Sequence, residues 1–191
     1  MPKKRKVPID WVEYTPLGQC IPDTPFIASK TPLSAKLCSR LPSVDHHFTP
    51  VQLVKEIASC GHRLRKVVDL TATVRYYDAD EFKTFNVEYV KIPTPGGSLP
   101  RIALLWEFAD EVKAFKKRWR HWLDDGSVIC VHCTHGVNRA GYFICKYLIN
   151  YEGWHAEEAI RQFETYRGHK FEFPYFIEDV LNSDPSCLLQ T

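Results

Sequence analysis

A cysteine and an arginine stand six positions apart in the segment VICVHCTHGVNRAGY, residues 128–142. The apolar residues before Cys133 predict a buried strand, and those after Arg139 predict a helix. A loop that joins a strand to a helix N-terminus directs main-chain N–H groups and the positive end of the helix dipole toward one point, which suits a tetrahedral anion. Gly136 supplies the backbone freedom that such a turn needs, and Arg139 offers paired donors to phosphoryl oxygens.

The same surroundings favour the thiolate form of Cys133 over the thiol. A thiolate that faces a bound phosphate is positioned as a nucleophile, so the segment predicts phosphoryl transfer to sulfur and then hydrolysis of a phosphocysteine. Arg139 and the loop amides can stabilise the equatorial oxygens, so we expect no metal and no other cofactor. The residues between the cysteine and the arginine are expected to surround the phosphate: Thr134, His135, Gly136, Val137 and Asn138.

Cys133 also has two simpler explanations. One is a buried cysteine without a chemical role, as we expect for Cys130 and Cys145, because cysteine is often buried. The other is a redox or zinc pair with Cys130, but Cys130 is expected inside the strand and facing away from the loop, and no second pair completes a zinc site. His132, at the strand end, is expected to support the loop structurally, and His135 to stabilise it through hydrogen bonds.

Strands and helices alternate along the chain. Strands are predicted at residues 26–29, 66–70, 86–92 and 127–133. Helices are predicted at residues 50–59, 102–123, 139–152 and 156–167. This alternation predicts an α/β fold with a central, mostly parallel sheet flanked by helices. The Cys133 loop would then lie at the carboxyl end of a central strand, where α/β sheets bind ligands.

The chain of 191 residues suits a single domain, expected over residues 8–183, between a basic N-terminal tail at 1–7 and a C-terminal tail at 184–191. Residues 8–50 are rich in proline and turn residues and are expected to wrap around the domain. The seven cysteines are odd in number and scattered, which favours a reducing compartment. We find no membrane span and no signal peptide, and nothing requires more than a monomer.

The net charge of +2 is unevenly distributed. Residues 3–6 carry four positive charges, which leaves the rest of the chain at a net −2. A domain without a basic surplus must bind an anionic ligand through a local site. The head PKKRKV is typical of a nuclear-import signal or a nucleic-acid arm, and equally of a solvated tail or an added tag. The expected location is therefore the nucleus or the cytoplasm.

Cys-x5-Arg between a strand and a helix resembles the signature of the cysteine-dependent phosphatases. The longer string HCTHGVNRAGY is similar to their RNA 5′-triphosphatase and diphosphatase branch, which has a dual-specificity-like fold. The resemblance covers most of residues 8–180 and includes GQCIPDTPFIASKTPL, VVDLTATVRYYD and FETYRGHKFE. The RGH string favours the stand-alone RNA/ribonucleoprotein-interacting and baculovirus members over capping enzyme.

The resemblance implies that the substrate is the 5′ end of triphosphorylated or diphosphorylated RNA, trimmed toward the monophosphate. Lys30 and Arg75 are then candidate contacts for the outer phosphates. Asp69 ends a predicted strand and is expected either to orient Arg139 or the attacking water, or to cap local amides. Protein phosphatases need a general acid in a loop that here reads IPTPGGSLP, residues 92–100, without Asp or Glu. That absence favours a phosphoanhydride, whose leaving group is itself a phosphate.

Two positions depart from the family pattern. Ala140 stands where relatives place Ser or Thr, whose hydroxyl assists departure of the sulfur, so we expect slower hydrolysis of the phosphocysteine. Phe173 stands where relatives tend to place a basic residue, so a phosphate contact is missing or is replaced by Lys170.

Three alternative functions remain open at this stage. The first is a dual-specificity protein phosphatase or a phosphoinositide phosphatase, which would need an acid in the substrate-facing loop. The second is a non-catalytic binder of 5′-phosphorylated RNA. The third is a general nucleic-acid binder that uses the basic head and shows a steep salt dependence.

Overall fold

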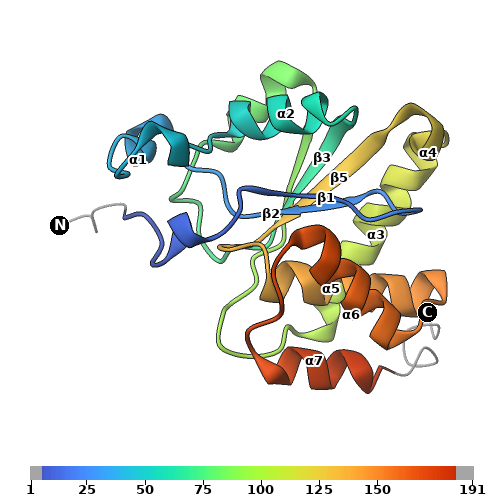
Figure 1. The fold of residues 1–191 in the computed structure, drawn as a ribbon. Helices are drawn as coiled ribbons and strands as arrows, with labels where there is room; N and C mark the ends of the chain where they lie inside the picture. Colours follow the sequence, from blue (N-terminus) through green and yellow to red (C-terminus); the bar gives the residue numbers. More distant parts are fainter. Residues whose placement is uncertain (1–5, 184–191) are drawn as a thin grey trace.

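Five strands form one sheet in the order β1-β2-β5-β3-β4 (Figure 1). The strands are β1 (Leu17–Cys20), β2 (Phe26–Ser29), β3 (Arg63–Asp69), β4 (Glu88–Lys91) and β5 (Ser127–His132). Only β1 runs antiparallel to its neighbour; the other three pairings are parallel. The computed structural model describes residues 6–183, so most of the basic head and the whole C-terminal tail lie outside the described residues. The predicted mostly parallel sheet is confirmed.

Helices cover both faces of the sheet. They are α1 (Ala35–Cys38), α2 (Pro50–Ser59), α3 (Ile102–Arg118), α4 (Trp122–Asp125), α5 (Asn138–Glu152), α6 (Ala156–Arg167) and α7 (Pro174–Leu181), with short 3-10 turns η1 (Trp11–Glu13), η2 (Val44–His46) and η3 (Ala79–Phe85). Figure 1 shows α2 on one face and α5, α6 and α7 on the other. The wrapping arm predicted for residues 8–50 supplies β1, β2 and α1 as well as loops.

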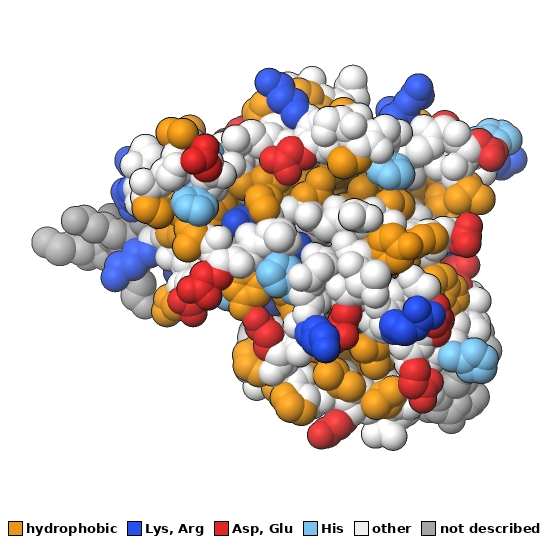
Figure 2. All heavy atoms as spheres, in the orientation of Figure 1, with side chains coloured by type: hydrophobic (Ala, Val, Ile, Leu, Met, Phe, Trp, Pro, Cys, Tyr) orange, Lys and Arg blue, Asp and Glu red, His pale blue; other side chains and the backbone are white. Residues whose placement is uncertain are grey.

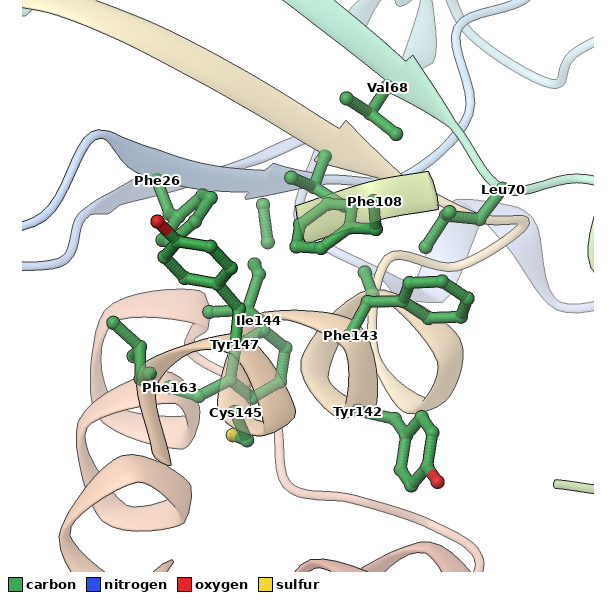
Figure 3. Close-up of a cluster of buried hydrophobic side chains, with 14 of the residues drawn as sticks. Phe26, Val68, Leu70, Phe108, Tyr142, Phe143, Ile144, Cys145, Tyr147 and Phe163 are labelled. Carbon is green, nitrogen blue, oxygen red and sulfur yellow. The ribbon is translucent and has the colours of Figure 1, made fainter. Parts of the chain in front are cut away.

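Strand β5 is buried along its whole length because it lies between two parallel neighbours and two helical layers. Its side chains alternate: Ile129 and Val131 belong to the core under α3 and α5, and Cys130 to the core under α2. Figure 3 shows aromatic side chains of the first core between the sheet and α5, where the Phe108 and Phe143 ring centroids are 5.5 Å apart. The rigid strand places Cys133, just beyond its end, on the α5 side.

The structure differs from the sequence prediction in three places. The helix predicted over 102–123 ends at Arg118, because Trp119 leaves helical geometry (φ −108°, ψ 64°) and its ring lies 4.2 Å from the Arg65 guanidinium. Strand β1 and helix α7 were not predicted, since β1 has only four residues with little apolar alternation and α7 has only eight residues, the first of them Pro174. The predicted helix at 50–59 is confirmed, with a capping box between Thr49 and Gln52.

Two further observations concern the described residues. No helix among residues 6–183 has both the length and the apolar character of a membrane span. Six cysteines are described and all are free thiols: Cys20, Cys38, Cys60, Cys130, Cys133 and Cys145.

Candidate active site

The loop from Cys133 to Val137 joins the end of β5 to the start of α5. Gly136 adopts φ +70°, and a Cβ atom there would lie 2.1 Å from the carbonyl oxygen of Ser29. Only glycine tolerates both the conformation and the close approach to the neighbouring strand end. The Thr31 N–H, which follows β2, donates to the Thr134 carbonyl at 3.0 Å. The loop is therefore held tightly against the sheet.

The main-chain N–H groups of the loop are available to a ligand. Within residues 6–183, none of the amides of residues 134–137 donates a hydrogen bond to another part of the chain. The first turn of α5 follows at once, and its N–H groups lack partners inside the helix. Unpaired amides at the N-terminus of a 15-residue helix can bind an anion, which is the role that the sequence predicts for this loop.

Arg139 is anchored along one edge of its guanidinium group. Its Nη1 donates to the carbonyl oxygens of Leu70 and Thr94 at 3.2 and 2.7 Å, and its Nη2 donates to the Thr134 hydroxyl at 3.0 Å. Guanidinium has five N–H donors. Within the described residues, the Nε–H and one Nη2–H have no acceptor, which leaves two donors for the oxygens of a phosphoryl group.

Cys133 is 4% exposed and lines a cavity of about 490 Å³ together with Arg139. Four segments far apart in the sequence form its walls: Asp10 and Tyr14; Gly96 and Gly97; Cys133, Thr134, His135, Asn138 and Arg139; and Glu172, Phe173, Tyr175 and Phe176. These segments meet near the carboxyl end of β5 (Figure 1). The loop at 92–100 therefore lines the cavity of the nucleophile through Gly96 and Gly97, as the family resemblance implies. No residue of that loop is acidic.

The cavity contains two carboxylates that the sequence reasoning did not single out, Asp10 and Glu172. Glu172 is held in place, because Asn138 Nδ2 donates to its Oε2 at 2.7 Å and the Tyr14 hydroxyl donates to its Oε1. Burial and the Glu172 carboxylate raise the pKa of Tyr14 well above its usual range, so the phenol keeps its proton. Glu172 could have been identified from the sequence, because it is the last residue of the family string FETYRGHKFE. No sequence pattern identifies Asp10.

Arg167 supports the loop from behind. Its guanidinium is 2% exposed and donates to the Gly136 and His135 carbonyls, each at 2.9 Å, and to Thr15 Oγ1 and the Thr15 carbonyl at 2.7 and 2.8 Å. Burial lowers the pKa of Arg167 to about 10, while the sulfur of Cys133 acts in the opposite direction. Arg167 remains charged at neutral pH. In the sequence, Arg167 is marked only as part of the family string FETYRGHKFE.

His132 is wholly buried, and burial lowers its pKa, so the ring is neutral. Its Nδ1 lies 3.2 Å from the Cys133 carbonyl oxygen, which can only accept, so Nδ1 carries the proton. Its Nε2 accepts from the Tyr77 hydroxyl at 2.7 Å. The ring therefore holds the main chain at the nucleophile, in agreement with the structural role predicted for it.

Asp69 does not orient Arg139, and this part of the prediction is wrong. Its carboxylate is 2% exposed, accepts from Lys91 Nζ at 2.8 Å and Tyr89 Oη at 2.9 Å, and accepts from the Thr71 N–H at 2.7 Å. The carboxylate is thereby enclosed, away from an attacking water. The alternative, that Asp69 caps a local amide, is confirmed by its bond to Thr71.

Lys30 was predicted to contact the outer phosphates, and the structure directs it elsewhere. The residue is 1% exposed, its ammonium donates to the carbonyl oxygens of Trp11 and Tyr14 at 3.1 and 2.8 Å, and it lies 3.6 Å from the centre of the Trp11 ring. Burial lowers the pKa of Lys30 to about 8, and the nearby charge of Arg167 contributes to this decrease. Lys30 therefore fastens the N-terminal segment.

The remaining predicted residues are placed as follows. Arg75 is exposed, and its Nη2 donates to the Tyr76 hydroxyl at 3.1 Å, so its contact with outer phosphates stays a prediction. Lys170 lines a different hollow, between α6 and α7, and not the Cys133 cavity, so it does not replace the missing basic residue at 173. Ala140 is fully buried in the α5 core. His135 lines the cavity, and its ring stacks on Tyr14, with centroids 4.4 Å apart.

Comparison with known proteins matches the sequence of this chain to a known family of domains. Residues 55–183 match the family model described as "Dual specificity phosphatase, catalytic domain". The RNA/RNP complex-1-interacting phosphatase of Rattus norvegicus is 38% identical over 177 residues, which is 93% of this chain and 53% of that protein. The "Tyrosine-protein phosphatase" of Autographa californica nuclear polyhedrosis virus is 39% identical over 174 residues, 91% of this chain and 98% of that protein.

The chain thus spans about half the length of the rat relative and almost the whole of the viral one. Among solved structures, a putative protein tyrosine phosphatase from Leishmania major aligns with a TM-score of 0.65 at 17% identity, over 89% of this chain and 99% of that chain. Tk-PTP in its active form aligns with a TM-score of 0.57 at 18% identity, over 87% and 97%. These likenesses agree with the fold.

Proposed function

The chain belongs to the family of dual specificity phosphatase catalytic domains and is a cysteine-dependent phosphatase; from this premise we propose that its substrates are RNA 5′ ends, from which it removes the γ- and β-phosphates. Two relatives support the proposed association with RNA, because the rat and human proteins carry the name RNA/RNP complex-1-interacting phosphatase. Entry into the nucleus through the PKKRKV head is a second proposal, on a segment mostly outside the described residues.

One observation carries the choice of an anhydride substrate. The loop at 92–100 lines the Cys133 cavity through Gly96 and Gly97 and contains no acidic residue. An alkoxide or phenoxide leaving group requires a proton from a general acid, whereas a phosphate departs from an anhydride without one. Glu172 cannot take over the role of an acid while Asn138 and Tyr14 occupy its two oxygens.

The mechanism uses groups of this chain at each step. The Cys133 thiolate attacks the terminal phosphorus, a P–S bond forms, and the bond to the bridging oxygen breaks as the shortened RNA leaves with the electron pair. Arg139 binds two equatorial oxygens through its Nε–H and Nη2–H, and the amides of residues 134–137 bind the others. Water then attacks the phosphocysteine and returns the thiolate. Because Ala140 offers no hydroxyl to the departing sulfur, this second step is slow.

The test measures phosphate release from γ- and β-labelled triphosphate RNA beside a phosphotyrosine peptide. We expect wild type to release both labels from RNA, Cys133→Ser to release neither, and the control Cys60→Ser, at an exposed thiol outside the cavity, to match wild type. RNA turnover that survives Cys133→Ser contradicts the mechanism. Peptide turnover equal to or faster than RNA turnover contradicts the substrate class.

A second candidate function, a phosphotyrosine phosphatase, is favoured by Asp10. This exposed carboxylate lines the cavity and is a candidate general acid in place of the missing loop acid. If the peptide is the substrate, Asp10→Asn slows peptide turnover by about 10²-fold or more, the scale of general acid catalysis. If RNA is the substrate, Asp10→Asn leaves the rate of phosphocysteine formation from RNA unchanged.

A further inference from the structure

Phe173 is the exposed large hydrophobic side chain of the active-site cavity. It is 48% exposed, and it lines the same cavity as Cys133. The proposed chemistry gives it no role, and neither does the hydrophobic core, which does not include it. A partly exposed aromatic side chain that lines a catalytic cavity is available to a bound ligand.

Phe173 is fixed relative to the catalytic loop. Its main-chain N–H donates to Asn138 Oδ1 at 3.2 Å, and the same oxygen accepts from the Glu172 N–H at 2.9 Å. Asn138 directly precedes Arg139, so the residue that positions the ring also begins the phosphate-binding helix. The backbone beyond it is restrained by Pro174 in the first turn of α7.

The ring of Phe173 is also oriented in advance. It stacks on Tyr175 with centroids 5.7 Å apart and an interplanar angle of 14°. Tyr175 in turn contacts Phe176, with centroids 4.6 Å apart, and Phe176 is only 2% exposed. The three rings therefore form one wall of the cavity, with Phe176 at its buried end and Phe173 at its open end.

The position of a ligand ring along this wall depends on the ligand. The ring of phosphotyrosine is joined to the attacked phosphorus by one oxygen, so it must lie close to the nucleophile, deep in the cavity. The first base of a 5′-triphosphorylated RNA is separated from that phosphorus by two further phosphates and a ribose, so it must lie at the open end. Phe173 lines the same cavity as the nucleophile and is 48% exposed, so its ring is accessible to a base that extends outward from Cys133. A base stacks on an aromatic face whatever its sequence.

The charge of the cavity agrees with this role. On the described walls the only Lys or Arg is Arg139, whereas Asp10 and Glu172 are acidic. Figure 2 shows Lys and Arg side chains interspersed with Asp and Glu on the face drawn, without a continuous basic field. Contacts to phosphates other than the attacked one therefore add little affinity for the RNA. Stacking of a base on an aromatic ring adds affinity without needing a basic residue.

We propose that Phe173, backed by Tyr175, is the platform on which the first base of the RNA substrate stacks. This inference rests on the proposed function and adds to it a specificity-determining contact. The same position, for which the sequence predicts a missing phosphate contact, then carries a base contact instead.

The test compares two 5′-triphosphorylated dinucleotides that differ only in the first base: adenine in one, an abasic ribose in the other. We expect wild type to prefer the adenine substrate about tenfold in kcat/KM, a difference within the range of one base stack. Phe173→Ala should abolish this preference, and Phe173→Trp should keep it. Phe85→Ala is the matched control, since Phe85 is 37% exposed but outside the cavity, and it should keep the preference.

The outcomes separate this inference from the proposed function. Cys133-dependent turnover of both dinucleotides with no preference in wild type, or with a preference that survives Phe173→Ala, overturns the platform and leaves the RNA phosphatase standing. Turnover of neither dinucleotide, together with a peptide KM that rises in Phe173→Ala, overturns both and assigns the ring to a peptide substrate.

Discussion

Replacing Arg167 by methionine tests how far catalysis depends on a residue that does not touch the cavity. The guanidinium donates four hydrogen bonds of 2.7–2.9 Å, two of them to the carbonyls of Gly136 and His135 in the catalytic loop. Methionine fills much of the same space but donates nothing, so the loop loses its support while the core stays packed.

The expected loss of stability depends on how exposed the oxygens are that lose their hydrogen bonds from Arg167. Thr15 is exposed, so water replaces its two bonds, but Gly136 is buried and His135 is half-buried. Each buried carbonyl left without a donor costs about 1–3 kcal/mol, so we expect Arg167→Met to lose about 3 kcal/mol of the free energy of unfolding. For a domain of this size that corresponds to a melting temperature lower by about 9 °C. Displacement of the loop by a fraction of an ångström to one ångström should reduce kcat by about 10²-fold.

The assay pairs urea unfolding with phosphate release on the same preparations. Arg161→Met is the matched control, because Arg161 lies on the same helix, is exposed and, within residues 6–183, pairs through its side chain with Glu158 alone. An exposed pair contributes at most about 1 kcal/mol, so the control should resemble wild type. Arg167→Lys should fall between wild type and Arg167→Met, because an ammonium cannot reproduce the planar fork. If Arg167→Met matches Arg161→Met in both stability and kcat, the reasoning is refuted.

Three further predictions concern the loop and its surroundings. Burial would raise the pKa of Asp69, but the Lys91 ammonium and the Thr71 N–H hold it below its ordinary value, so Asp69→Asn should cost about 3 kcal/mol of unfolding free energy at pH 7. That difference from wild type should shrink as pH falls below about 4, where the carboxyl group of the unfolded chain protonates, and be lost as pH falls through the lower pKa of the folded state. A difference unchanged at pH 3 in urea titrations contradicts the assignment. Gly136→Ala should abolish activity and lower the melting temperature, because its Cβ overlaps a main-chain carbonyl. Ala140→Thr should speed phosphocysteine hydrolysis in rapid-quench experiments, and an unchanged or slower rate is the opposing result.

The chemistry of the site was readable from the sequence because it is local. The strand, the turn glycine, the nucleophile and Arg139 lie within one short segment, whose apolar pattern and loop length fix their relative positions. Cys130 was predicted correctly to face away from the loop, since side chains alternate along a strand. The family resemblance and the α/β fold are likewise confirmed.

The surroundings of the site were less predictable because they depend on contacts between distant segments. Lys30 resembled a phosphate ligand by its charge, but the path of residues 11–14 turns its ammonium onto main-chain carbonyls. Asp69 was placed correctly at a strand end, yet Lys91 on the neighbouring strand takes its carboxylate. Asp10 lines the cavity although it lies more than a hundred residues before Cys133 in the sequence. No sequence pattern predicts this position.

The N-terminal segment has a practical consequence for anyone who prepares this enzyme. The family match begins at residue 55, but Tyr14 and Thr15 hold Glu172 and Arg167, and β2 pairs with the last four residues of β5, from Ile129 to His132. A fragment that begins at residue 55 would lack β2, so one edge of β5 would be unpaired. It would also lack the hydrogen bonds from the N-terminal segment that support the catalytic loop. Such an edge invites pairing with other copies. Recombinant boundaries should therefore begin before Ile9, whose carbonyl accepts from His135.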